Sequence, residues 1–365
     1  MGNQSSCLKF AIIGHQDNWE KIRQFIDFTR KSKGSASLEL EQIKGIYTYI
    51  PARPVFDIHI HSSLGIDCHG FYIESFISPD ELGPNHLRSN IQKVKDSCNL
   101  ASRMGADIVA LGGFTSIFLE SGGLQATRIG NTCFTTGNTL TAALVVEGIE
   151  KACIQKGMPL DQTRLLIVGS TGDIGSACVR YFSGKVKKIL LCARREKQLK
   201  IQSGELRRMG QDADYATDIN AFLPATDLLI AVASSLLTDA NPNLLSNHAI
   251  ICDAGYPKNL NQNFKLICPD RVFEGGMGVI TQKFHFNPVI WESIYRFPVP
   301  YTVHGCVLES IVLALEGIKQ PYSVGRGNIT VEDMREISQR AKKHGILLTP
   351  LFHPDAKQPE PAGIM

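Results

Sequence analysis

The fold is decided by one stretch, Leu165-Leu166-Ile167-Val168-Gly169-Ser170-Thr171-Gly172-Asp173-Ile174-Gly175-Ser176-Ala177. An apolar run with strand character leads into a glycine turn, and the turn opens a helical pattern. Three glycines at this spacing allow a tight turn, close approach to a pyrophosphate and close helix packing, while free N–H groups at the helix start attract phosphate. We interpret the turn as a dinucleotide site formed by Gly169, Ser170, Thr171, Gly172, Asp173, Ile174 and Gly175; the structural alternative is a plain glycine turn.

The next expected strand ends at Arg194 and Arg195. A site selective for NAD carries an Asp or Glu at this point, where it binds the ribose hydroxyls. Two arginines in its place favour the 2′-phosphate of NADPH, with a solvated helix start as the alternative. The sequence leaves open which arginine makes the contact.

Strand-like and helical patterns alternate along the whole chain, which is typical of an α/β protein. We expect a doubly wound Rossmann domain together with an α/β substrate domain. Strands are predicted at residues 8–14, 56–62, 71–78, 107–111, 164–168, 188–193, 227–233 and 249–253, and helices at 18–33, 79–104, 138–157, 305–317 and 330–344. The expected units are an N-terminal α/β substrate domain (1–140), an NADP-binding Rossmann domain (141–300), a C-terminal helical segment (301–349) and a mobile tail (350–365).

Composition excludes several classes of protein. Hydrophobic residues make up 43% and charged residues 20% of the chain, and the net charge is +3, so no strong nucleic-acid footprint is present. The ten cysteines contain no C-x-x-C pair, which favours a reduced, cytoplasmic protein. No apolar run approaches the roughly 20 residues of a membrane span. We therefore expect no nucleic-acid partner and no transmembrane segment.

Cys306 lies where an apolar helical pattern begins after a loop. A thiol in a first helical turn is expected to have a lowered pKa, which suits a nucleophile. The alternative is a small buried apolar residue, and the pattern alone does not decide between the two. His304 is close in sequence and is a candidate base, although residues two apart need not face each other.

Four stretches carry a resemblance to a known family: residues 110–117 (ALGGFTSI), 134–139 (FTTGNT), 172–177 (GDIGSA) and 255–259 (GYPKN). Over nearly the whole chain, and most specifically in these stretches, the sequence resembles the long-chain acyl-acyl-carrier-protein reductases; the first 90 residues match more loosely. These NADPH-dependent enzymes make fatty aldehydes and supply alkane synthesis in cyanobacteria. Gly137-Asn138-Thr139 also resembles the shikimate-dehydrogenase-like two-domain arrangement, in which such residues face an interdomain cleft.

The resemblance implies roles for individual residues. Cys306 matches the family's nucleophile. The resemblance therefore implies that the C-terminal segment 301–349 contains the nucleophile and packs on the N-terminal domain. Asn138, Thr139 and Lys258 are expected near the developing oxyanion, and Gly255 and Tyr256 beside the cofactor. The implied partners are acyl carrier protein or acyl-CoA as substrate and an aldehyde-consuming enzyme. Two departures stand out: His304 occupies a usually apolar position, and Ala254 replaces a usual glycine.

Other interpretations stay open at this point. A shikimate-type NADP-dependent dehydrogenase requires no thiol, and a non-catalytic NADPH-binding partner of a lipid enzyme binds cofactor without turnover. Asp57, His59, His61, Cys68 and His69 suggest zinc, but their spacing is not a closed ligand set, so no metal is predicted. Four basic residues of the last expected helix suit either an acidic carrier protein or solvent: Arg335, Arg340, Lys342 and Lys343.

Overall fold

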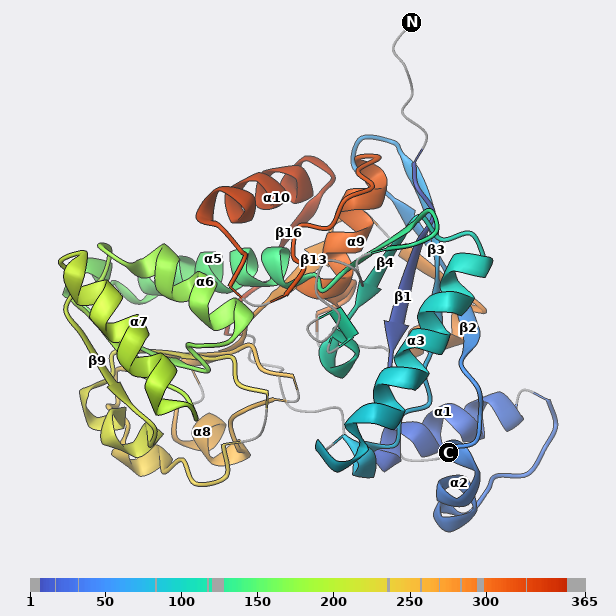
Figure 1. Ribbon diagram of the computed structural model, residues 1–365, viewed down its shortest axis with the longest axis horizontal. Coiled ribbons are helices and arrows are strands. Elements are labelled where there is room, and N and C mark those ends of the chain that lie inside the picture. The colour runs from blue at the N-terminus through green and yellow to red at the C-terminus, as the bar shows by residue number, and fades with distance from the viewer. Residues whose placement is uncertain are drawn as a thin grey trace, which may run out of the picture.

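The glycine turn joins β7 (Arg164–Val168) to α6 (Asp173–Phe182) in a computed structural model of the chain. The structure describes residues 7–352 apart from residues 17, 32, 83, 117, 120–127, 235–236, 257, 269, 283, 294–298 and 326. Two lobes lie side by side, and the glycine turn belongs to the lobe that carries α6 and α7 (Glu196–Arg208) (Figure 1).

The lobe with the turn contains a six-stranded sheet of order β12-β11-β10-β7-β8-β9, and all of its pairs are parallel. This is the strand order 3-2-1-4-5-6 of a doubly wound dinucleotide-binding sheet, read from β9. Besides β7, its strands are β8 (Lys188–Cys192), β9 (Ala213–Ala216), β10 (Leu228–Ala231), β11 (Ile250–Asp253) and β12 (Val272–Glu274), and α8 (Gln262–Ile267) covers one face. The predicted Rossmann fold is confirmed.

The other lobe contains a seven-stranded mixed sheet of order β14-β2-β3-β1-β4-β6-β5. β1, β3, β4 and β6 are parallel, whereas β2, β5 and β14 pair antiparallel with their neighbours. The strands are β1 (Phe10–Gly14), β2 (Arg53–His61), β3 (Asp67–Glu74), β4 (Ile108–Leu111), β5 (Arg128–Ile129), β6 (Thr132–Thr135) and β14 (Phe284–Asn287). β14 lies in the range 141–300, which was expected to form the Rossmann domain. The chain therefore returns to the N-terminal lobe before it forms the C-terminal helices.

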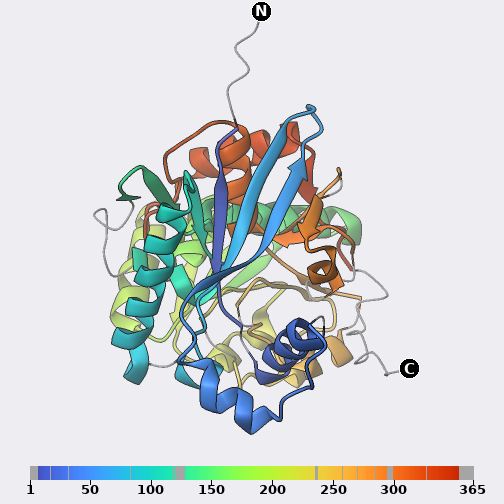
Figure 2. The ribbon, with the colours of Figure 1, turned by 90° about the vertical axis from the view of Figure 1, so that its right-hand side faces the viewer.

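Helices of the N-terminal part cover this sheet on one side. α3 (Leu87–Arg103) packs on an apolar face formed by alternate residues of β1, β3 and β4. Figure 2 shows this helix beside the sheet, viewed from the side of this lobe. α1 (Trp19–Lys31) and α2 (Leu40–Tyr47) form a separate small core at one end of the lobe. The opposite face of the sheet is packed by α9 (Gly305–Leu315).

α5 (Asn138–Lys156) lies between the two lobes, and twelve of its nineteen residues are buried. It contacts α6 of the dinucleotide lobe, and it contacts α9 and α10 (Val331–Lys343) of the C-terminal segment. A three-stranded antiparallel sheet of β15 (Thr302–His304), β13 (Met277–Ile280) and β16 (Ile346–Leu348) adjoins α5. Because most of α5 is buried, it connects the dinucleotide lobe with the C-terminal helices.

One predicted helix is wrong in extent. Residues 79–104 were expected as a single helix, but two short 3₁₀ helices (Pro79–Glu81 and Pro84–His86) precede α3, which begins at Leu87. Pro84 lacks the N–H that a continuous helix needs at that point. The expected strands at 8–14, 107–111, 188–193, 227–233 and 249–253 are confirmed within two residues at most ends. The strands expected at 56–62 and 71–78 correspond to β2 and β3, which both begin earlier in the sequence. Most of the predicted mobile tail, residues 353–365, lies outside the described residues.

Candidate active site

The turn after β7 has a geometry that only glycine accepts at two positions. Gly169 has a φ of 86°, and a Cβ there would lie 2.7 Å from the carbonyl oxygen of Val232. A Cβ at Gly175 would lie 2.1 Å from the carbonyl oxygen of Gly169. The Ser170 hydroxyl is buried and has no hydrogen-bond partner among the described residues. The backbone packing and this unused polar atom at the start of α6 fit a bound pyrophosphate.

The two arginines that follow β8 line a cavity that the glycine turn also borders. Arg194 and Arg195 line it together with Gln198 and Thr217. Arg194 lies 3.5 Å from the Ser234 hydroxyl, and Arg195 is the residue that precedes α7. Both guanidinium groups stand where an NAD site has its carboxylate, so the residues present fit a 2′-phosphate.

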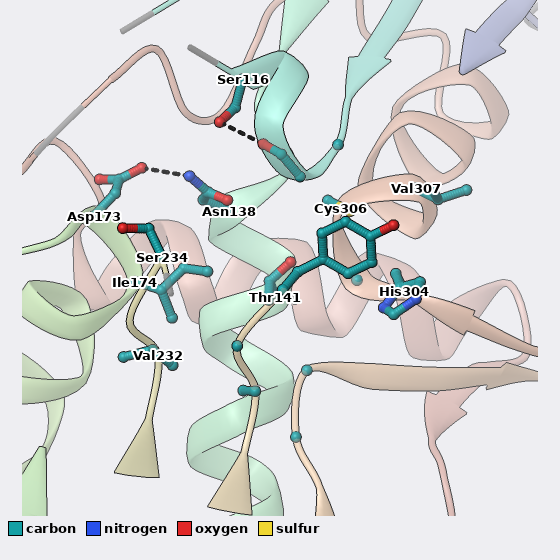
Figure 3. Close-up of a pocket in the computed structure, with 18 of the residues that line it drawn as sticks. Ser116, Asn138, Thr141, Asp173, Ile174, Val232, Ser234, His304, Cys306 and Val307 are labelled. Atoms are coloured by element: carbon teal, nitrogen blue, oxygen red, sulfur yellow. Dashed lines mark hydrogen bonds between the residues drawn. The ribbon is translucent and has the colours of Figure 1, made fainter. Parts of the chain in front are cut away.

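A single cavity of about 590 Å³ runs between the lobes. Five residues of the predicted turn line it: Gly169, Thr171, Gly172, Asp173 and Ile174. Asn138, Lys258, Gly255, Tyr256, His304 and Cys306 line it as well. Figure 3 shows the Asp173 and Ile174 side of the cavity facing Cys306 and His304 across Asn138 and Thr141. The predicted cofactor turn and the predicted nucleophile therefore share one space.

Cys306 is the second residue of α9, so its thiol lies in the first helical turn. Burial raises the pKa of the Cys306 thiol to about 11, and the nearby charge of Glu309 adds to the rise. Backbone N–H groups of Val307, Cys306 itself and Gly113 donate to the sulfur and oppose the rise. The expected lowering of the pKa is wrong for the resting thiol because desolvation outweighs the helix N-terminus.

The turn after β4 packs directly against this thiol. A Cβ at Gly112 would lie 3.2 Å from the Cys306 sulfur, and Gly113 has a φ of 59°. The next N–H, of Phe114, donates to Nε2 of His15 at 3.2 Å. His15 Nδ1 lies 3.1 Å from the carbonyl oxygen of Gln16, so the ring carries its proton on Nδ1 and accepts at Nε2. His15 thus fixes the turn that holds the Cys306 sulfur.

His15 was missed at the sequence level. Its signal is its place directly after β1, beside the carboxyl end of β4, since parallel strands present their ligand-binding loops on one edge. Its neighbour across the cavity is Tyr256, whose ring lies 5.9 Å from the His15 ring and 5.7 Å from the His304 ring. His304 is therefore placed against an aromatic ring near Cys306.

The N-terminus of α5 brings Asn138 to the cavity wall. Its side-chain amide donates to a carboxylate oxygen of Asp173 at 3.0 Å (Figure 3), which links α5 to the cofactor turn. Thr139 is fully buried and does not line the cavity, and its backbone N–H donates to Glu309. Thr141, one turn further, lines the cavity and was not predicted.

Lys258 and the Gly255-Tyr256 pair follow β11. The Lys258 ammonium donates to the carbonyl oxygen of Asp253 at 3.2 Å and lies 3.9 Å from the Glu274 carboxylate. A Cβ at Gly255 would lie 2.3 Å from the Asn259 side chain, so the loop closes only with glycine. All three predicted residues line the cavity.

Beyond Cys306, the cavity continues as an apolar arm inside the N-terminal lobe. One wall is formed by alternate residues of β2 and β14, and α9 provides another. The lining residues of this apolar arm are Ile12, Phe56, Ile58, Ile60, Ile280, Phe284, Phe286 and Ile311. Phe284 pairs with Ile60, and Phe286 with Ile58, across adjacent strands. The arm therefore follows the strands along the inner face of the sheet.

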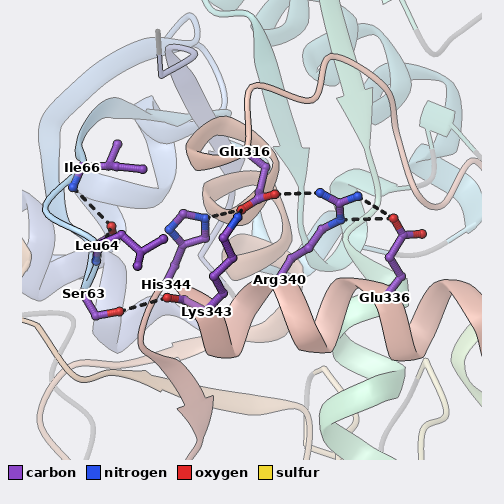
Figure 4. A network of polar contacts seen from close by, with 9 residues as sticks. Ser63, Leu64, Ile66, Glu316, Glu336, Arg340, Lys343 and His344 are labelled. Carbon is purple, nitrogen blue, oxygen red and sulfur yellow. Dashed lines mark hydrogen bonds and ion pairs between the residues drawn. The ribbon is translucent and has the colours of Figure 1, made fainter. Parts of the chain in front are cut away.

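The basic residues of α10 are engaged within the chain. Arg340 pairs with Glu316 at 2.7 Å and with Glu336 at 2.5 Å, and Lys343 pairs with Glu316 at 2.8 Å (Figure 4). Lys342 pairs with Glu147 of α5 at 3.0 Å. Three of the four predicted basic residues thus fasten α10 to its neighbours.

The histidine-rich strand also has internal partners. His61 pairs with Asp67 at 2.8 Å, and the Nδ1 atoms of His59 and His69 lie 2.7 Å apart. No group of three or more metal-ligating side chains converges on a metal position in the described part of the chain. Over the same residues, no helix is both long and apolar enough to cross a bilayer.

Comparison with known proteins gives one close match in length and several distant ones. No family model matches the chain. A long-chain acyl-[acyl-carrier-protein] reductase of Synechococcus elongatus is 31% identical over 347 residues, which cover 92% of this chain and 97% of that protein. The aminotransferase PigE of a Serratia strain is 26% identical over 94% of this chain, but the match covers 40% of that protein.

Solved structures resemble the chain only weakly. L-tryptophan dehydrogenase from Nostoc punctiforme is 15% identical with a TM-score of 0.39, covering 95% of this chain and 86% of that one. Quinate dehydrogenase from Corynebacterium glutamicum, in complex with NAD, is 10% identical with a TM-score of 0.36, covering 91% and 98%. The fold assignment therefore rests on the strand order of the two large sheets.

Proposed function

Because the chain belongs to the long-chain acyl-[acyl-carrier-protein] reductase family, and is thus an NADP-dependent oxidoreductase, we propose a specific reaction for it. In this proposal the protein reduces a fatty acyl thioester to a fatty aldehyde. The thioester is carried by acyl carrier protein or by coenzyme A, and Cys306 carries the acyl group between the two half-reactions. One observation carries the proposal: a single cavity connects the dinucleotide turn, the Cys306 thiol and the apolar arm.

In the first half-reaction, the Cys306 thiolate attacks the thioester carbonyl. A new carbon–sulfur bond forms at Sγ, the old one breaks, and the carrier leaves as its thiol after taking up the proton that Cys306 gave up. The N–H groups of Gly113 and Val307, which donate to the sulfur, stabilise its negative charge. His15 supports this step indirectly, because it holds the Gly113-Phe114 turn in place.

In the second half-reaction, the acyl group on Cys306 is reduced to a thiohemiacetal. NADPH, when bound at the glycine turn, supplies the hydride. Asn138 and Lys258 line the same cavity as Cys306 and are proposed to bind the developing oxyanion, and the buried Thr139 is proposed to support Asn138. Collapse of the thiohemiacetal breaks its carbon–sulfur bond, releases the aldehyde and restores Cys306.

The apolar arm is proposed to hold the acyl chain. Along β2 it extends from Phe56 to Ile60, which at 3.4 Å per residue is about 14 Å. Each buried methylene contributes about 0.8 kcal/mol to binding, so the arm favours a long chain over a short one. The aldehyde product is equally apolar, and an aldehyde-consuming enzyme is the proposed partner at release.

The test is intact-protein mass spectrometry after incubation with acyl carrier proteins and coenzyme A loaded with chains of different length, without NADPH. We expect an adduct of the mass of the acyl group, located by peptide mapping on Cys306. Cys306→Ala should abolish the adduct and aldehyde formation while the protein still binds NADPH.

Cys7→Ala is the matched control, because Cys7 is also partly accessible but does not line the cavity. It should keep both the adduct and the turnover. Aldehyde formation at the wild-type rate by Cys306→Ala would reject the covalent mechanism. Oxidation of a small hydroxy acid without any thiol requirement would favour a shikimate-type dehydrogenase instead.

A further inference from the structure

Glu309 is a fully buried carboxyl group one helical turn after Cys306, on the same helix α9. No role for it was predicted from the sequence. Its carboxylate reaches across to the N-terminus of α5: one oxygen accepts from the Leu140 N–H at 3.0 Å, and the other accepts from the Thr135 hydroxyl at 2.5 Å. The Thr139 N–H donates to it as well. Glu309 therefore caps a helix other than its own.

This cap joins the two backbone segments that meet at the thiol. A Cβ at Gly137, the residue before α5, would lie 2.2 Å from the carbonyl oxygen of Cys306, so the two chains are in direct contact. Gly137 also donates its N–H to the Thr135 hydroxyl that binds Glu309. A shift of the Glu309 carboxylate would move the start of α5, and Asn138 with it, relative to Cys306.

The charges around Glu309 favour an effect on the thiol. Burial raises the pKa of Glu309 to about 7, while its three hydrogen-bond donors hold the ionised form. The charged groups that face it are Asp173 from α6, which raises its pKa further, and Cys306 from its own helix. A charged Glu309 carboxylate therefore disfavours the charged thiolate form of Cys306.

We propose that Glu309 is a positioning residue that ties the Cys306 turn of α9 to the N-terminus of α5 and, through its negative charge, opposes ionisation of that thiol. This rests on the proposed role of Cys306. Substitution by glutamine separates the two effects. A glutamine oxygen accepts from the Leu140 N–H, and its NH₂ group donates to the Thr135 hydroxyl oxygen, so the tie remains and the charge is lost.

The experiment measures alkylation of Cys306 by iodoacetamide against pH in the full-length protein, quantified by mass spectrometry of the Cys306 peptide. In Glu309→Gln we expect alkylation at pH 8 to be about tenfold faster, because removal of one nearby charge shifts the profile by about one pH unit. Glu309→Ala loses the tie too, and its kcat for aldehyde formation should fall at least about tenfold with little change in KM for NADPH.

Glu316→Gln is the matched control, because Glu316 is the C-cap of α9, at the opposite end of the helix from Cys306, and binds cations of α10. It should leave the alkylation profile unchanged. If Glu309→Gln does not fold, Thr135→Val removes a donor to the same carboxyl group, which then stays protonated to higher pH, and alkylation at pH 7.5 should again become faster.

An unchanged alkylation profile in Glu309→Gln, or in Thr135→Val where that variant replaces it, overturns the electrostatic part of the proposal. An unchanged kcat in Glu309→Ala overturns the positioning part. Alkylation does not depend on turnover, so these outcomes stay distinguishable from failure of Cys306 as the nucleophile, which Cys306→Ala reports.

Discussion

The cofactor turn and the region around the Cys306 thiol each contain a glycine at which two backbone segments touch. The two segments are close in the sequence at the turn and far apart in the sequence at the thiol. At the turn, a Cβ on Gly175 would lie 2.1 Å from the carbonyl oxygen of Gly169, six residues earlier. At the thiol, a Cβ on Gly137 would lie 2.2 Å from the carbonyl oxygen of Cys306. Both glycines allow close backbone contact, but the second contact joins the starts of α5 and α9, which are far apart in the sequence.

The difference shows in what each region depends on. The turn's closest backbone contact, from Gly175 to Gly169, lies within one strand–turn–helix unit, and the neighbouring strands add contacts to Val232 and Cys192. The thiol region needs four segments at once: the end of β1 with His15, the turn after β4, the start of α5 and the start of α9. Its hydrogen bond from Thr135 to Glu309 spans 174 positions. We expect the two regions to fail separately.

The largest difference between the two regions is expected when alanine replaces Gly137 or Gly175. Gly137→Ala places a Cβ inside the Cys306 backbone and forces alanine into a φ of 69°, so turnover should fall at least about 100-fold while NADPH binding persists. Gly175→Ala should abolish NADPH binding, measured by fluorescence titration, and leave iodoacetamide alkylation of Cys306 intact.

The control for this pair is Gly157→Ala, at the far end of α5. Gly157 has a φ of 63°, but nothing lies within 4 Å of its would-be Cβ. It carries the cost of the left-handed backbone alone, about 1 kcal/mol of stability, and should keep full activity at 25 °C. Loss of both functions in Gly137→Ala would contradict the separation of the two regions.

What the sequence predicted follows the same division. Residues 165–177 predicted the strand–turn–helix unit and, through it, the Rossmann lobe, because the spacing of the three glycines is visible in the sequence. Arg194 and Arg195 were placed at the same cavity by their position after β8. The short strands β14, β15 and β16 were missed, since each has only three or four residues and is stabilised by partners far away in the sequence.

The site residues divide in the same way. Cys306 was identified through a family resemblance, whereas its supports, His15 and Glu309, carry no motif and act through backbone groups of other segments. The expected low pKa of the thiol was wrong because a helix start is visible in a sequence and the burial of its first turn is not. Only the packed structure shows which effect dominates.

The pH dependence should differ between the two regions. Because the pKa of Cys306 is raised to about 11, the fraction of thiolate grows about tenfold for each pH unit between 7 and 10. The rate of acyl-enzyme formation, measured by rapid quench without NADPH, should therefore rise about 100-fold from pH 7 to 9. The Kd for NADPH should not follow this rise. A flat acylation rate would show that substrate binding lowers the pKa of the thiol before attack.

The arginines test the cofactor region alone. We propose that Arg194 and Arg195 bind the 2′-phosphate, and a charge-assisted hydrogen bond of this kind contributes about 1.5–3 kcal/mol. Arg194→Ala or Arg195→Ala should raise KM for NADPH about tenfold or more, with KM for NADH unchanged. Lys197→Ala is the control, because Lys197 is an exposed cation in the first turn of α7, shortly after the two arginines in the sequence. An equal loss for both cofactors would place the arginine away from the 2′-phosphate.

The smallest effect is expected at the far end of α9, where Glu316 joins that helix to α10 through Arg340, Lys343 and His344 (Figure 4). The cations hold the pKa of Glu316 below its usual value despite partial burial. A depressed pKa means that the stabilisation is present above the unfolded-state value of about 4.3 and disappears as pH falls through the folded-state value.

Glu316→Gln should therefore lower the free energy of unfolding by about 1 kcal/mol at pH 7, and by less at pH 3, in urea titrations followed by circular dichroism. Turnover and NADPH affinity should both stay within about twofold of wild type, because the contacts at Cys306 lie at the opposite end of the helix. A large loss of turnover without a loss of stability would mean that the position of Cys306 depends on the whole of α9, and the boundary of the thiol region would then extend to α10.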